Sequence, residues 1–363
     1  MLFKLMNKDT PWLLFDCYED EFGFTAGKEI EWYTPLRPIG YNNIGDFLDA
    51  RKAPKHRKHI AELLKKYGCE STENFLRVTH ALSLNDTFWV KEPESLLSWD
   101  KVSLYRNEFD ELVSNAAFDG VISSTTLSST SPEFGTDGAY AKCWQRENDT
   151  VYLYKSGSDT YEIEPLSEFL ASQVADILCH NHVAYDLTFY HGRLASKCKL
   201  FTSEQFGLAK MSVLSVPNRR NPAALLRFAA QYGSEDLMRR MFVLDALILN
   251  IDRHLGNVGF LFDDDTMRIT GMAPIYDNNR SLLFYFDTET LEKRPEWCVS
   301  KCEPRISVDF IKTAQAVLTD ELKADLKNMV GFRFQPPVGI NVPMDRLEAL
   351  SRILNIQLDK ILQ

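Results

Sequence analysis

The sequence contains no apolar run near the ~18 consecutive residues that a membrane-spanning helix needs. The first residues, Met1 to Lys4, do not continue into the apolar segment and small-residue cleavage site of a signal peptide. Long disorder is also unexpected, because hydrophobic residues make up 45% of the chain and charged residues 25%. We therefore expect a globular, cytoplasmic protein without membrane contact.

Three functional classes have little support. The formal net charge is −10, and there is no helix-turn-helix or zinc-finger pattern, so we expect no direct nucleic-acid binding. Of the seven cysteines only Cys298 and Cys302 are close together, and no suitable Cys/His pair follows them. Reduced thiols are therefore favoured over a zinc site. The absence of a Walker A sequence disfavours a P-loop NTPase.

The pattern along the 363 residues predicts three parts. Residues 1–95 are an accessory region in which a small antiparallel meander precedes helices, and the basic segment 51–66 is interpreted as a solvated face. Residues 96–206 form a sheet-rich nucleotide-binding lobe, and residues 207–363 a mainly helical catalytic lobe. The second lobe includes an apolar helix over 236–249 and a hairpin with an acidic turn.

The chemistry is concentrated in two short segments of the third part. Asn250-Ile251-Asp252-Arg253-His254-Leu255-Gly256-Asn257 follows the apolar helix, and Ala273-Pro274-Ile275-Tyr276-Asp277 follows the hairpin. Phosphoryl transfer needs a carboxylate that accepts the proton of the acceptor hydroxyl, and an amide oxygen and a second carboxylate that hold Mg²⁺. Asp252, Asn257 and Asp277 occur in the order that supplies these groups, which indicates an ATP-dependent kinase.

The preceding part contains candidates for binding the nucleotide. Gly135 and Gly138 lie in a loop where backbone N–H groups could approach phosphate oxygens. Lys155 ends a strongly β-forming run, and Glu168 lies near the start of the amphipathic helix that follows. A strand lysine paired with a helix glutamate orients ATP phosphates in kinases. Lys142 competes with Lys155 for the phosphate-binding role.

On these motifs, over roughly residues 120–290, the sequence resembles the HipA-type serine/threonine kinases of bacterial toxin–antitoxin systems. The resemblance implies an α+β, bilobal protein-kinase-like fold with a small N-terminal accessory region. It implies Asp252 as catalytic base, Asn257 and Asp277 as Mg²⁺ ligands, and Lys155 with Glu168 at the ATP phosphates. It also implies a protein substrate with a Ser or Thr hydroxyl and an antitoxin partner.

Members of the family can also silence themselves by autophosphorylation in the glycine-rich loop. In this chain the candidate acceptor is Thr136 or a hydroxyl of the Ser/Thr-rich run 123–131. Two alternatives stay open. The Asp-Arg-His-x-x-Asn loop also resembles phosphoinositide 3-kinases, which favours a lipid or small-molecule kinase, and a nucleotide-binding pseudokinase module is the alternative outside the enzymes.

Overall fold

The computed structural model describes residues 1–21, 25–54, 56–121 and 131–363. The chain folds into two compact units. The first comprises Met1–Lys155, Lys199–Ala209 and Leu261–Ile269, and the second comprises Ser156–Cys198, Lys210–Phe260 and Thr270–Gln363. Neither unit coincides with one of the three parts expected from the sequence, whose boundaries near 95 and 206 stay predictions.

The first unit is built on short strands with small helices between them. Its elements are β1 (Leu2–Asn7), β2 (Thr10–Glu19), β3 (Thr25–Trp32), α1 (Ile44–Asp49), α2 (Ile60–Lys66), α3 (Thr72–Thr79), β4 (Phe88–Lys91), α4 (Trp99–Val102), α5 (Glu111–Asp119), the 3-10 helix η1 (Pro132–Gly135), β5 (Lys142–Glu147) and most of β6 (Thr150–Ser156).

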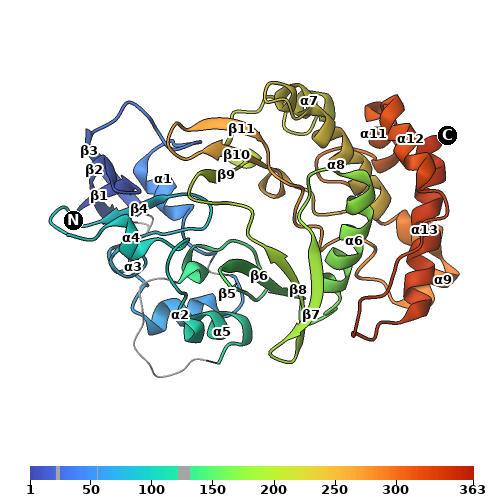
Figure 1. Cartoon of the computed structure of the whole chain (residues 1–363), viewed down its shortest axis with the longest axis horizontal. Helices are drawn as coiled ribbons and strands as arrows, with labels where there is room; N and C mark the ends of the chain where they lie inside the picture. The colour runs from blue at the N-terminus through green and yellow to red at the C-terminus, as the bar shows by residue number, and fades with distance from the viewer. Residues whose placement is uncertain (22–24, 55, 122–130) are drawn as a thin grey trace. The chain divides into compact units, whose positions relative to one another are not determined.

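The N-terminal sheet, blue and cyan in Figure 1, has the strand order β3-β2-β1-β4 with every pairing antiparallel. The predicted antiparallel meander is thus confirmed. Its side chains alternate, as a strand's period of two requires, so that Phe3, Leu5 and Phe15 are buried on one face. The helices α1 and α3 pack against this sheet.

The hairpin of β5 and β6 carries two of the residues singled out from the sequence. Its turn residues Asn148 and Asp149 both have positive φ, 47° and 65°, as a tight two-residue turn demands. The resulting antiparallel register sets Lys142 opposite Lys155. Both lysines are buried.

The basic segment 51–66 is only partly the solvated face expected from the sequence. Arg51 is buried and donates to both carboxylate oxygens of Asp86, at 2.7 and 2.9 Å. Arg57 is also buried, and it donates to the backbone carbonyl oxygens of Glu133 and Lys142 at 2.6 Å each. Burial lowers the pKa of Arg57 to about 10, so the guanidinium keeps its charge near neutral pH.

The second unit is mainly helical. Its elements are α6 (Glu164–Leu178), β7 (Tyr185–Tyr190), β8 (Arg193–Lys199), the 3-10 helix η2 (Met211–Val213), α7 (Pro222–Ala230), α8 (Glu235–Ile248), the 3-10 helix η3 (Leu255–Asn257), α9 (Thr288–Lys293), α10 (Pro295–Val299), α11 (Phe310–Val317), α12 (Asp320–Asn328) and α13 (Met344–Leu362). The chain passes between the units within β9 (Phe206–Lys210), β10 (Gly259–Asp263) and β11 (Arg268–Met272), which form a sheet of order β11-β10-β9.

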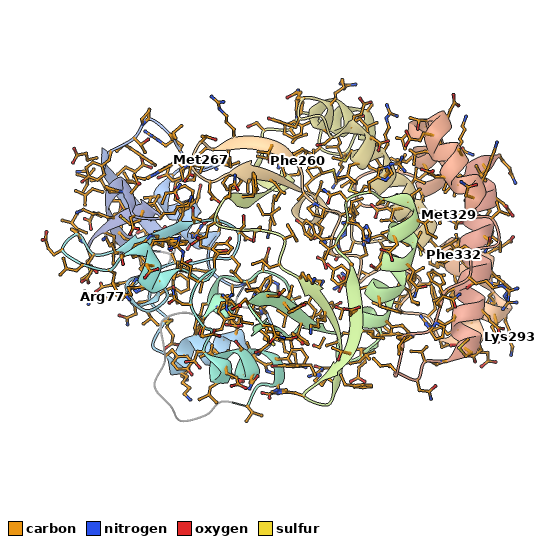
Figure 2. The ribbon with its side chains drawn as sticks, viewed as in Figure 1. Arg77, Phe260, Met267, Lys293, Met329 and Phe332 are labelled. Carbon is orange, nitrogen blue, oxygen red and sulfur yellow. The ribbon has the colours of Figure 1, made fainter. Side chains whose placement is uncertain are left out.

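Helix α8 is the core of the second unit, which confirms the predicted apolar helix over 236–249. Its residues from Met241 to Ile248 are all buried, and α6, α7, α11 and α13 contact it. Phe260 on β10, labelled in Figure 2, packs edge-on against Phe228 of α7 at a centroid distance of 5.4 Å. These contacts give the loop that follows α8 a rigid origin.

Among the described residues, no helix is long and apolar enough to span a bilayer. Within the same ranges no group of three or more His, Cys, Asp or Glu side chains is arranged to hold a metal ion. All seven cysteines are free thiols, and only Cys302 is not fully buried.

The three aspartates of the β10–β11 turn have separate roles. Asp263 accepts from the backbone N–H and the hydroxyl of Thr266, at 2.8 Å each, and so stabilises the turn. Asp265 pairs with Lys8 at 2.6 Å. Asp264 is fully buried, and burial, reinforced by the charge of Asp86, raises its pKa to about 8.

This raised pKa predicts a pH-dependent stability. Between about pH 4 and about pH 8 the folded chain holds a proton on Asp264, whereas the unfolded chain releases it. The contribution of Asp264 to the unfolding free energy is therefore fully present below the pKa of the unfolded chain. It is lost as the pH rises toward the pKa of the folded chain. Asp264→Asn cannot ionise, and we expect it to reduce the loss of unfolding free energy between about pH 5 and about pH 8 by on the order of 2–4 kcal/mol. Urea denaturation at several pH values measures this change. Asp265→Asn, at an exposed neighbour, is the control, and equal pH slopes for wild type and Asp264→Asn would contradict the assignment.

Candidate active site

The loop that carries Asp252 begins where α8 ends. Leu249 takes the left-handed conformation, with φ of 52°, which turns the chain out of the helix. Two backbone bonds then join this loop to the segment after Asp277. Leu282 N–H donates to the carbonyl of Ile248 at 2.6 Å, and Ile251 N–H donates to that of Arg280 at 3.2 Å. The two predicted motifs are therefore held side by side in the second unit.

Arg253 is the buried centre of this arrangement. Its Nε and Nη2 donate to the carboxylate of Asp245 on α8, at distances from 3.0 to 3.2 Å. Nη2 also donates to the side-chain oxygen of Asn278. Burial alone would lower the pKa of Arg253, but the Asp245 carboxylate outweighs this effect and keeps the pKa above its ordinary value.

The remaining donor of Arg253 connects the two motifs directly. Its Nη1 donates to the backbone carbonyl of Asn257 at 2.9 Å and to that of Tyr276 at 2.7 Å. The hydroxyl of Tyr276 donates to the carbonyl of Gly256 at 3.1 Å. The structure therefore brings the positions of Asn257 and Asp277 together through a single guanidinium.

Asp252 is fixed at its backbone and partly exposed at its carboxylate. Its N–H donates to the side-chain oxygen of Asn250 at 3.0 Å. Its carboxylate oxygens face two arginines, with Oδ1 at 3.1 Å from Nη1 of Arg305 and Oδ2 at 3.6 Å from Nη1 of Arg280. Neither arginine was predicted from the sequence, because nothing in the local pattern connects Arg305 with a residue so much earlier in the chain.

Asn257 and Asp277 each have a constrained geometry. Asn257 ends η3, and its side-chain nitrogen donates to the carbonyl of Asp252 at 3.4 Å, which directs the amide oxygen of Asn257 elsewhere. Asp277 has a φ of 59°, a conformation that costs about 1–3 kcal/mol outside glycine and that clusters at functional sites. Its N–H donates to the hydroxyl of Tyr185 at 3.2 Å.

Glu168 lies in the second unit, fully buried within α6, where Ser196 of β8 donates its hydroxyl to Oε2 at 2.6 Å. The helix begins at Glu164, so Glu168 is its fifth residue and belongs to the second turn. Lys155 belongs to the first unit, and its pairing with Glu168 stays a prediction.

The glycine-rich segment belongs to the first unit and is organised around Lys142. The ammonium of Lys142 donates to the carbonyl of Asp137 at 2.8 Å. Gly138 has a φ of 103°, a conformation that favours glycine, and a Cβ there would lie 2.0 Å from Nζ of Lys142, so any other residue would displace this ammonium. A Cβ on Gly135 would lie 2.6 Å from the carbonyl oxygen of Leu82. The sequence pattern missed Arg57, which donates to three carbonyls of this segment (Glu133, Thr136 and Lys142).

The candidate autophosphorylation site is only partly described. Thr136 is engaged within the first unit, since its hydroxyl donates to the carbonyl of Pro132 at 2.7 Å and accepts from Nε1 of Trp144 at 2.8 Å. Ser131 is buried. The other hydroxyls of the Ser/Thr-rich run, residues 123–130, lie outside the described residues.

Helices and antiparallel sheets of this arrangement define a protein-kinase-like fold, and the chain has the fold of the HipA-like kinases. One similar structure is HipA in the Shewanella oneidensis MR-1 toxin–antitoxin complex with HipB and operator DNA. The match covers 100% of this chain and 99% of the HipA structure's chain, with a TM-score of 0.54 and 11% sequence identity. The Helicobacter pylori proinflammatory kinase CtkA matches 64% of this chain and 92% of its own, with a TM-score of 0.50 and 20% identity. No family model and no curated protein matches the sequence. At these identities the likeness shows the fold, and it confirms the resemblance drawn from the motifs at that level.

The Arg253–Asp245 pair predicts a large loss of stability when one partner is removed. Arg253→Leu leaves a buried carboxylate without its counter-charge and is expected to lower the unfolding free energy by about 3–5 kcal/mol. The double replacement with Asp245→Leu should recover part of this loss, because no buried charge is then left unpaired. Urea denaturation measures each value. Arg352→Leu removes an exposed arginine whose contact with Glu292 is 3.9 Å long, and an equal cost at both positions would refute the interpretation.

Proposed function

We propose that this chain is an ATP- and Mg²⁺-dependent kinase that phosphorylates Ser or Thr hydroxyls of a protein. The observation that carries the proposal is the joining of the Asp252–Asn257 loop to the Tyr276–Asp277 segment through Arg253. In this proposal Asp252 is the catalytic base. Its side chain is 17% exposed, which lets the carboxylate reach an acceptor hydroxyl while the backbone stays fixed.

Asn257 and Asp277 are the proposed ligands of Mg²⁺. A hard cation prefers oxygen ligands, and this pair offers an amide oxygen and a carboxylate. The fit is supported by the amide of Asn257, whose nitrogen is engaged by the carbonyl of Asp252 at 3.4 Å and whose oxygen is left to coordinate. The left-handed backbone of Asp277 supports the same role, because such strain persists where function requires it.

Lys142 and Lys155 together are the proposed phosphate-binding lysines. The register sets the two residues opposite each other, so both side chains lie on the same face of the hairpin, and both are buried. Both are therefore proposed for the phosphates. Gly135 and Gly138 shape the loop beside Lys142, and Glu168 is the proposed partner of Lys155.

ATP supplies the γ-phosphoryl group, and transfer to the acceptor requires loss of the hydroxyl proton, which Asp252 accepts. The proposal assigns the lysines to one lobe of a bilobal kinase and Asp252, Asn257 and Asp277 to the other. An antitoxin partner is proposed only by analogy with the Shewanella HipA, which was solved with HipB. The lipid-kinase and pseudokinase alternatives are separated from this proposal by an assay of phosphate transfer.

Asp252→Asn tests the catalytic assignment. The amide cannot accept the hydroxyl proton, so transfer from Mg-ATP should fall by about 10²–10⁴-fold. Nucleotide binding should change little, because Asp252 is not among the proposed ATP or Mg²⁺ contacts. The readouts are labelled phosphate incorporated into a degenerate Ser/Thr peptide library and the thermal shift with Mg-ATP.

Asp159→Asn, at an exposed aspartate 2.9 Å from Arg193, is the matched control. Undiminished transfer in Asp252→Asn would end the assignment, and transfer to lipid alone would favour the phosphoinositide-kinase alternative.

Autophosphorylation provides a second test. After incubation with Mg-ATP we expect phosphate on the peptide that spans residues 121–142, detected by mass spectrometry, and none in the Asp252→Asn chain. Modification of Thr136 itself must break its bonds to Pro132 and Trp144, so we expect the modified hydroxyl to lie in the run 123–131. An unmodified 121–142 peptide would refute this prediction.

A further inference from the structure

The carboxylate of Asp252 lies between two arginines from different segments of the second unit. Arg305 contacts Oδ1 at 3.1 Å, and Arg280 contacts Oδ2 at 3.6 Å. Each carboxylate oxygen therefore has its own guanidinium. The two arginines therefore compete with an acceptor hydroxyl for the lone pairs of the proposed base.

Two guanidiniums share one carboxylate at this point. Arg253, the third arginine of this loop region, is compensated by the buried carboxylate of Asp245. Arg280 and Arg305 both contact Asp252, so neither has this carboxylate to itself. A second carboxylate that arrives with the acceptor would give Arg305 a counter-charge of its own.

The two arginines differ in how firmly they are held. The guanidinium carbon of Arg280 lies 5.6 Å from the centroid of the Phe284 ring, and its side chain is 36% exposed. Arg305 is 51% exposed, and only its end reaches Asp252. Arg305 is therefore the more easily released of the two.

The backbone under Arg305 is nevertheless well anchored. The next residue, Ile306, is buried beside a small cavity lined also by Phe242 of α8 and Phe310 of α11. The same cavity is lined by Asp245 and Arg253. The backbone of Arg305 thus has a fixed position relative to the loop of Asp252, while its side chain can exchange one anion for another. A guanidinium on a fixed backbone that can change its anionic partner is suited to distinguishing acidic from neutral side chains of a bound peptide.

We propose that Arg305 determines substrate specificity by binding an acidic side chain, Asp or Glu, that flanks the acceptor Ser or Thr. This inference rests on the proposed kinase function and extends it to the substrate. The acidic side chain takes over the contact of Arg305, and the Oδ1 atom of Asp252 then turns to the acceptor hydroxyl. An exposed ion pair is weak, so a peptide carboxylate competes with it readily. Arg280 stays on Oδ2 and keeps the carboxylate oriented.

The test uses peptide pools with a central Ser or Thr in which each flanking position is fixed in turn as Glu, Gln or Arg. For the wild type we expect kcat/KM for Glu over Gln at one position to be on the order of tenfold, the scale of a charge-assisted hydrogen bond at a half-exposed site. Arg305→Ala should bring this ratio to about one, Arg305→Lys should keep part of it, and Arg305→Glu should shift the preference to the Arg pool. Arg352→Ala, at an exposed arginine on α13, should keep the wild-type ratio.

Binding is measured separately by fluorescence anisotropy, with peptides whose acceptor is replaced by Ala. Wild type should bind the Glu peptide more tightly than the Gln peptide, and Arg305→Ala should bind both alike. If this pattern holds while no peptide receives phosphate, the proposed kinase activity fails and the recognition by Arg305 stands.

Three outcomes overturn the inference. The first is a Glu-to-Gln ratio that survives in Arg305→Ala, which would make Arg305 only a positioning residue for Asp252. The second is an Arg305→Ala chain that loses affinity for Mg-ATP with its peptide ratio unchanged, which would place the nucleotide at this arginine. The third is an equal loss of the ratio in Arg352→Ala, which would show that the effect is not local.

Discussion

The buried ion pair of Arg253 and Asp245 is the interaction on which the candidate site depends. It joins α8, whose residues from Met241 to Ile248 are all buried, to both segments that carry the proposed catalytic residues. Arg253 is the common donor to the backbone carbonyls of Asn257 and Tyr276. Because a buried pair is costly to separate, the positions of these segments are fixed by the core and not by the nucleotide.

Arg253 and Arg305 show how burial changes the strength of an arginine–aspartate ion pair. The contacts of Arg253 are shielded from water, so they act as a permanent part of the framework. The contact of Arg305 with Asp252 is half-exposed, so water and other anions compete for it. The Asp252 loop therefore contains a buried guanidinium, that of Arg253, and contacts a half-exposed one, that of Arg305. This contrast separates a structural role from the proposed recognition role.

Local patterns predicted much of this molecule. The apolar face of α8, the N-terminal meander and the spacing of Asp252, Asn257 and Asp277 could all be inferred from neighbours in the chain. The roles of residues that contact distant segments could not be inferred in this way. Arg57 was assigned to a solvated face because its carbonyl partners lie far along the chain, at Glu133 and Lys142. Asp264 was assigned to an acidic turn, since its burial beside Thr87 depends on tertiary packing. Arg305 gave no signal, because its partner Asp252 lies far from it in the sequence.

The hairpin between β5 and β6 has a consequence for how this fold can vary. Asn148 and Asp149 fill a turn of two residues, and that length alone keeps Lys142 across from Lys155. Adding or deleting one residue there would slide one strand against the other and carry one of the lysines to the opposite face of the sheet. The number of residues between the two lysines is thus as much a requirement of the proposed phosphate site as the lysines themselves.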